Sequence, residues 1–153
     1  MHRGRMGMRK ILSCLLVLAF GTGPAWGALG QSEASVHADR QQMAGQMKSA
    51  TFQRYTVHEI TGAGGIIVRE YVSPAGMVFG VAWESATMPN LPQLLGPYFA
   101  PVRQAIENRR VRGPLYVQSG PLVVESGGRM RAFRGRAYLT NLIPAELTKD
   151  VVR

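Results

Sequence analysis

The chain has 153 residues, 46% of them hydrophobic and 18% charged, and its 18 lysines and arginines outnumber nine aspartates and glutamates, for a formal net charge of +9. It contains no heptad pattern, low-complexity tract or clear internal repeat, which argues against a coiled coil or a solenoid. Cys14 is the only cysteine, so no internal disulfide can form.

The first 27 residues have the three regions of a cleavable secretory signal. Basic residues come first, an apolar run over residues 11–20 follows, and Ala25-Trp26-Gly27 places small residues at the positions that signal peptidase reads. The apolar run is about half as long as the roughly 20 residues that a membrane-spanning helix needs. We therefore predict a signal peptide over residues 1–27, starting at Met1 or Met8 and removed by signal peptidase between Gly27 and Ala28.

Cleavage would leave residues 28–153 as one domain, in the periplasm or secreted. Four of the 18 basic residues precede residue 28, so 14 remain against nine acidic residues, a net charge of +5. That excess favours solubility, and the basic residues do not alternate with exposed aromatic rings as a nucleic-acid-binding surface requires. We expect no nucleic-acid partner and no permanent membrane span after cleavage.

The first half of this domain predicts one short helix and three strands. The helix covers residues 32–48, with Ser32 or Ser35 as its cap. Strands over residues 51–60, 66–72 and 77–84 are joined by short turns and should form an antiparallel meander. Glycines occupy the first turn, but a strand follows them rather than a helix, so they indicate a hairpin and not a phosphate-binding loop.

Strand alternation assigns two faces to this meander. One face collects Phe79, Val81 and Trp83 among its apolar side chains and should form the core. The other collects Tyr71 and Val78 and should be half exposed, with Tyr71 as an exposed aromatic residue. A change of register by one residue would exchange the two faces.

The second half begins with a helical region over residues 89–109, interrupted at Gly96-Pro97. Strands over residues 115–118, 122–125 and 130–139 follow it, separated by glycine- and proline-containing turns. The chain therefore predicts a single-domain α+β fold. We expect an antiparallel sheet of about six strands in two meanders, a central helix packed on one face, and a short N-terminal helix.

His58 and Glu70 are the candidate catalytic residues. In the proposed register both point to the core side from adjacent strands, where an unpaired carboxylate is costly and must find a partner or a proton. The pair could perform general acid–base chemistry, or it could be an internal structural hydrogen bond. We favour the structural interpretation.

Four arginines, Arg129, Arg131, Arg134 and Arg136, form the densest basic feature of the sequence. Alternation places Arg129 and Arg131 on one face, and Arg134 and Arg136 on the other. They could bind an anionic ligand such as a carboxylate, a phosphate or an acidic glycan. The alternative, which we favour, is a solvated or salt-bridged edge strand protected against aggregation.

Other chemistries lack the residues that they need. The serines considered, in turns or near helix starts, lack the strand–Gly-x-Ser-x-Gly–helix context of a nucleophile elbow. His37 and His58, the two histidines after residue 27, have no ligand partner at metal spacing. We expect neither a metal nor another cofactor.

Several segments together resemble a known family. They are ALG (28–30), YTVHE (55–59), VREYVSPAGMVF (68–79), GPL (113–115), LVVESGG (122–128) and MRAFRGRAYL (130–139). This composite is similar to an uncharacterised family of exported Gram-negative bacterial proteins, the domain-of-unknown-function family numbered 2844. The resemblance implies a single exported domain and implies no activity.

The sequence thus favours an exported periplasmic protein that binds rather than catalyses. We expect it to act as an accessory protein of the cell envelope, recognising an envelope protein or an anionic ligand through its C-terminal arginines. The alternative is a small hydrolase or isomerase that uses His58 and Glu70.

Overall fold

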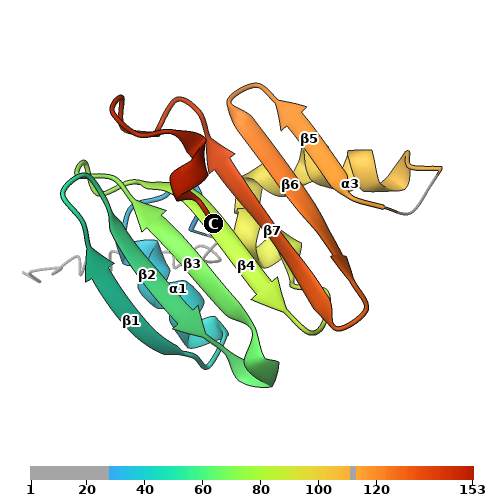
Figure 1. The fold of residues 1–153 in the computed structure, drawn as a ribbon, viewed down its shortest axis with the longest axis horizontal. Coiled ribbons are helices and arrows are strands. Elements are labelled where there is room, and N and C mark those ends of the chain that lie inside the picture. The colour runs from blue at the N-terminus through green and yellow to red at the C-terminus, as the bar shows by residue number, and fades with distance from the viewer. Residues whose placement is uncertain (1–27, 111–112) are drawn as a thin grey trace, which may run out of the picture.

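The computed structural model describes residues 28–110 and 113–153 (Figure 1). The predicted signal peptide lies outside these residues. Helices and strands follow in the order α1 (Ala34–Gln42), β1 (Gln46–Thr51), β2 (Thr56–Thr61), η1 (Ala63–Gly65), β3 (Ile67–Val72), β4 (Val78–Ser85), α2 (Leu91–Leu95), η2 (Gly96–Tyr98), α3 (Phe99–Glu107), β5 (Leu115–Ser119), β6 (Leu122–Arg129), β7 (Ala132–Leu139) and η3 (Lys149–Val151).

The strands of this part of the chain form one antiparallel sheet in the order β1-β2-β3-β4-β7-β6-β5. It consists of two meanders that meet where β4 pairs with β7. The three α-helices lie behind the sheet in Figure 1, and the C-terminal segment crosses its front. The predicted antiparallel sheet with a central helix on one face is therefore confirmed, but the sheet has seven strands rather than about six.

The additional strand comes from the second half of the predicted N-terminal helix. The prediction of a helix over residues 32–48 was wrong beyond α1, because Ala44 has a left-handed backbone (φ 47°) that turns the chain back. At Gly45 a β-carbon would lie 2.6 Å from Ile60 Cγ2, so the turn fits closely against β2. β1 then pairs with β2 along its full length, and this ladder outweighs the helical spacing of the apolar residues.

The main hydrophobic core lies between the sheet and the helices. Trp83, Leu95 and Leu139 are among its fully buried side chains, and α1 contributes Val36. The break predicted at Gly96-Pro97 is present, since Gly96 (φ 51°) ends α2 and η2 leads directly into α3. This break lets two short helical segments, rather than one long helix, follow the twisted sheet.

A smaller cluster lies on the opposite face, and one of its members corrects the predicted faces. Tyr71 pairs with Gly80 whereas Val72 pairs with Val78, so Phe79 is the extra residue of a β-bulge. The bulge places Phe79 beside Tyr71 on the helix-free face and Val78 in the main core. The predicted sides of Phe79 and Val78 were therefore exchanged.

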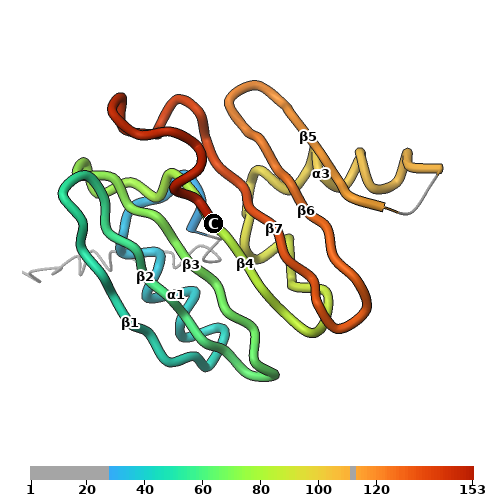
Figure 2. Tube along the Cα trace, in the orientation of Figure 1, coloured from blue at the N-terminus to red at the C-terminus, as the bar shows by residue number. Residues whose placement is uncertain are grey.

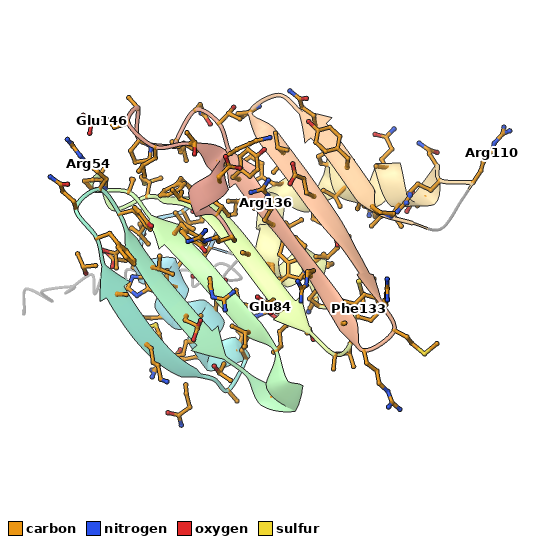
Figure 3. The ribbon with its side chains drawn as sticks, in the orientation of Figure 1. Arg54, Glu84, Arg110, Phe133, Arg136 and Glu146 are labelled. Atoms are coloured by element: carbon orange, nitrogen blue, oxygen red, sulfur yellow. The ribbon has the colours of Figure 1, made fainter. Side chains whose placement is uncertain are left out.

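The C-terminal segment covers this smaller cluster. Val152 is fully buried against Gly80, and the Tyr71 hydroxyl donates to the Arg153 main-chain oxygen (2.5 Å) and accepts from its N–H (3.0 Å). Arg54 and Glu146 form an ion pair at the corner of the sheet, with 2.5 Å between Nη2 and Oε2. Figure 3 labels both side chains. Tyr71 is consequently only 3% exposed, and the prediction that it is an exposed aromatic residue was wrong.

Candidate functional site

Two adjoining hollows of about 590 and 560 Å³ open on the helix-free face of the sheet. They share Arg69, Glu84 and Arg153, and we refer to them together as the trough. Tyr116, 62% exposed, lines it at the β5 side, and Phe52, 51% exposed, lines it at the β1 side. Figure 2 shows the helices behind the sheet, so the trough faces solvent on the side that they leave uncovered.

A single row of cross-strand partners forms the floor of the trough. In strand order from β1 to β5 it consists of Lys48, Glu59, Arg69, Ala82, Arg136, Glu125 and Tyr116. Opposite charges are therefore neighbours on each side of Ala82, which is the cross-strand arrangement that stabilises neighbouring strands. Ala82 is the small residue between the two central arginines.

Both central arginines are held in ion pairs. Arg69 Nε donates to Glu59 (2.8 Å) and Arg69 Nη1 to Glu84 (3.0 Å). Arg136 Nε donates to Glu125 (2.7 Å), and this hydrogen bond raises the pKa of Arg136. Arg136 also donates to the Val152 main-chain oxygen (3.1 Å), which ties the C-terminal segment to β7; Figure 3 shows Arg136 beside that segment. These two arginines serve the fold.

Arg134 differs from them. It lies on the same face of β7, opposite Glu84 of β4 and Gly127 of β6, and it lines the trough with an exposed side chain. Glu84 is engaged by Arg69 instead. Within residues 28–110 and 113–153, Arg134 forms no ion pair or side-chain hydrogen bond, so its guanidinium group is free to meet a ligand.

The four predicted arginines do not form one patch. Arg134 and Arg136 share a face, as predicted. Arg129 ends β6 and Arg131 occupies the β6–β7 turn with a left-handed backbone (φ 67°), and both are exposed outside the residues that line the trough. Whether any of them binds a ligand stays a prediction, and the geometry separates one free arginine in the trough, Arg134, from one structural arginine, Arg136.

His58 is buried, as predicted, on the helix-covered face directly opposite Glu70. Its hydrogen bonds, however, join two other residues. His58 Nδ1 lies 2.7 Å from Ser49 Oγ on β1, and Nε2 lies 2.7 Å from Glu33 Oε1 just before α1. The chain Ser49–His58–Glu33 has the composition of a hydroxyl activated by a histidine that a carboxylate orients.

Glu70 has a carboxyl neighbour in place of a base. Its side chain is fully buried and lies near Asp39 of α1, itself 2% exposed. Burial and then the nearby Asp39 raise the pKa of Glu70 well above its usual range, and burial raises the pKa of Asp39. The main-chain N–H of Ala28 donates to Asp39 Oδ2 at 3.1 Å.

The sequence-based prediction did not include Asp39, Ser49 or Glu33 in this cluster. Asp39 falls in the segment expected to be one helix and Ser49 comes directly after its predicted end, so the prediction separates the two by about the length of that helix. The turn at Ala44 instead places Ser49 on β1, beside His58 of β2, and leaves Asp39 on α1, near Glu70 of β3. The spacing of the apolar residues contained no signal for this.

Fold and sites together define a class: a small α+β protein with one antiparallel sheet, helices on one face and a charged trough on the other. None of the helices in the described ranges is long and apolar enough to span a membrane. The chain belongs to the family described as "Protein of unknown function (DUF2844)", whose model matches residues 25–152, and the family resemblance is thereby confirmed. No curated protein and no solved structure matches the chain.

Proposed function

We propose that this protein is exported with removal of residues 1–27 and acts in the periplasm as a non-catalytic binding protein of the cell envelope. Its ligand is an anionic group, a carboxylate or a phosphate, of another envelope component bound in the trough. The leader composition supports the export. One observation supports the binding: Arg134 is unpaired in an open hollow where Arg69 and Arg136 are neutralised by neighbours.

The shape of the trough supports an elongated ligand. It crosses the strands from Phe52 to Tyr116, so a chain lying in it would meet an aromatic ring at each end and Arg134 between them. Arginine matches planar carboxylate and phosphate groups through two parallel N–H donors. The trough itself is pre-formed because its charged floor is fixed by the ion pairs of Arg69 and Arg136.

Titration with two probes tests the binding: an oligogalacturonate for carboxylates and inorganic polyphosphate for phosphates, each followed by NMR shifts and calorimetry. Arg134→Gln should weaken binding of the preferred probe about tenfold, the scale of one charge-assisted contact. Arg129→Gln removes the same charge from the same hairpin outside the trough and should leave affinity unchanged. Equal losses in both variants, or no binding of either probe, would contradict the trough as the site.

A second candidate function uses the buried histidine, and the Ser49–His58–Glu33 chain is the observation that favours it. Both His58 nitrogens are engaged at 2.7 Å, as in a hydrolase whose histidine takes a proton from a hydroxyl. In this second candidate, Ser49 and Glu33 take the place of Glu70 as the partners of His58. A turnover assay with small ester probes distinguishes the candidates: hydrolysis lost in Ser49→Ala and retained in Ser85→Ala would favour the hydrolase.

A further inference from the structure

The first described residues are built into the main core. Ala28 and Leu29 have no exposed surface. The Gly30 N–H donates to the Val78 carbonyl (2.9 Å), and the Val78 N–H donates back to the Gln31 carbonyl (2.9 Å). The segment thus pairs with the start of β4, and the nitrogen of Ala28 is fixed beside α1.

That nitrogen bonds to the first of two neighbouring buried acids, Asp39 and Glu70. It donates one hydrogen bond to Asp39 Oδ2 at 3.1 Å. Asp39 and Glu70 are 2% and 0% exposed, and their carboxyl groups are close enough for each to shift the pKa of the other. Across the described ranges, no N–H or hydroxyl group donates to either Glu70 oxygen. Two ionised carboxylates buried this near each other repel, so the pair requires a proton or a cation.

No side-chain cation in the surroundings fills this role. His58, opposite Glu70 on β2, is already engaged by Glu33 and Ser49. Arg40 follows Asp39 in α1, but among residues 28–110 and 113–153 it forms no ion pair. The hydrogen-bond donor that does reach the pair is the Ala28 nitrogen, which bonds to Asp39 Oδ2.

We propose that Asp39 and Glu70 form a binding site for the α-ammonium group of Ala28, which is created when the signal peptide is removed. This inference rests on the proposed cleavage after Gly27. Hydrolysis of the Gly27–Ala28 peptide bond adds water: the hydroxyl goes to the Gly27 carbonyl carbon, and the Ala28 nitrogen gains protons to become –NH₃⁺ while Gly27 leaves as a carboxylate. One amide donor in the buried site is thereby replaced by three N–H donors and a full positive charge.

The charges of the site then balance. With one carboxyl group ionised and the other still protonated, the ammonium makes the buried group of three neutral, and the protonated carboxyl donates to its neighbour. Before cleavage the same site holds either an uncompensated carboxylate or two protonated acids. An uncompensated buried charge is strongly destabilising, so cleavage stabilises the fold.

Because the site needs the new ammonium group, the chain reaches its full stability only after export and cleavage. A chain that still bears the leader lacks the cation on which the acids of α1 and β3 depend. Once the leader is removed, the new N-terminus closes the contact between α1, β3 and the beginning of β4. This is a use for the Asp39–Glu70 pair that requires neither catalysis nor an external ligand.

Two forms of the protein test the inference: one beginning at Ala28, released from a fused carrier by a protease, and one that keeps Gly27. The form beginning at Ala28 should melt about 5–10 °C higher. Its Ala28 amine, followed through the ¹³C-labelled methyl group by NMR, should titrate above the usual range of about 7.7–8.0 for α-amino groups.

Asp39→Asn should abolish both differences, and Glu107→Gln on the exposed surface of α3 should abolish neither. The NMR titration needs only a folded chain, so it shows whether the Ala28 amine is bound by the acids even where Asp39→Asn lowers stability. Equal melting temperatures together with an amine that titrates near 8 would overturn the inference and leave export unaffected.

The intact mass of protein recovered from the periplasm separates the two proposals. A mature chain that begins at Ala28 supports both. A chain cut at another residue overturns the ammonium site while export stands. Retention of residues 1–27 in the cytoplasm overturns export, and with it the maturation step.

Discussion

At the scale of single residues, the buried carboxyl group of Glu70 has the largest consequences. The sequence predicted that Glu70 and His58 lie on the core side and that such a carboxylate needs a partner or a proton. It could not identify the partner, because Asp39 approaches from α1 across the core and no local spacing links positions 39 and 70. Pairing between neighbouring strands follows from short turns, whereas contact between a helix and a sheet depends on packing.

The raised pKa of Glu70 predicts how stability depends on pH in the form that keeps Gly27. The unfolded chain releases the Glu70 proton near pH 4.3, but the folded protein holds it to a higher pH. The free energy of unfolding should therefore fall as the pH rises from about 4 through the folded-state pKa. Urea unfolding at a series of pH values measures this slope.

Glu70→Gln supplies the comparison for that slope, because glutamine has nearly the same shape and does not titrate. The slope should shrink in Glu70→Gln and persist in Glu107→Gln, whose side chain is exposed. The same slope in all three proteins would show that Glu70 does not set the pH dependence.

At the scale of elements, the C-terminal segment depends on a glycine in β4. A β-carbon at Gly80 would lie 2.6 Å from Val152 Cγ2. Gly80→Ala should therefore displace the segment and cost about 1–3 kcal/mol of unfolding free energy, as overpacking does elsewhere. Urea unfolding gives the magnitude, and faster proteolysis after Lys149 reports the displaced segment.

A second substitution tests whether that contact is the cause. Val152→Ala removes the methyl groups that collide, so Gly80→Ala should cost less in the Val152→Ala background than in the natural chain. If the two losses simply add, the cost of Gly80→Ala arises elsewhere in β4.

Elements were predictable to the extent that local patterns define them. The turns at 61–65 and 73–76, the break at Gly96 and the three strands of the second meander follow from glycine, proline and apolar spacing. β1 was missed because its residues continue the spacing of α1, and the turn at Ala44 has no glycine in the left-handed position. The bulge at Phe79 was missed because an extra residue leaves the alternation of the sequence unchanged.

At the scale of the whole molecule, the pairing of β4 with β7 joins the two meanders into one sheet, and Gly135 lies at that joint. A β-carbon there would lie 2.5 Å from Trp83 Cζ2 and 2.7 Å from the Glu125 main-chain oxygen. The Trp83 ring and the backbone of β6 leave no room for this β-carbon. Gly135→Ala should lower the unfolding free energy by about 3 kcal/mol.

Gly127→Ala is the matched control, since the new β-carbon would meet its nearest atom, in Pro114, at 3.8 Å. Its cost should stay below about 1 kcal/mol. Tryptophan fluorescence and far-ultraviolet circular dichroism should give coincident transitions in both variants if the joined sheet unfolds as one unit. Separate transitions would mean that the meanders are independent.

How the two meanders join could not be derived from the sequence, because short turns specify neighbours within a meander only. The trough depends on this joint, since its floor takes residues from both meanders. Sequence reasoning thus identified Arg134 as a candidate and could not show that Arg69 and Glu84 of the first meander lie beside it.

The pairing of residues 28–32 with the start of β4, and the burial of Val152, have a practical consequence for labelling. A fluorophore or affinity handle attached at Ala28 or at Arg153 would disturb a packed contact. The loop between β2 and β3 offers a better position. At Gly64 and Gly65 an added β-carbon would meet no atom within 4 Å, so a flexible handle inserted between them would report on the protein without loosening it.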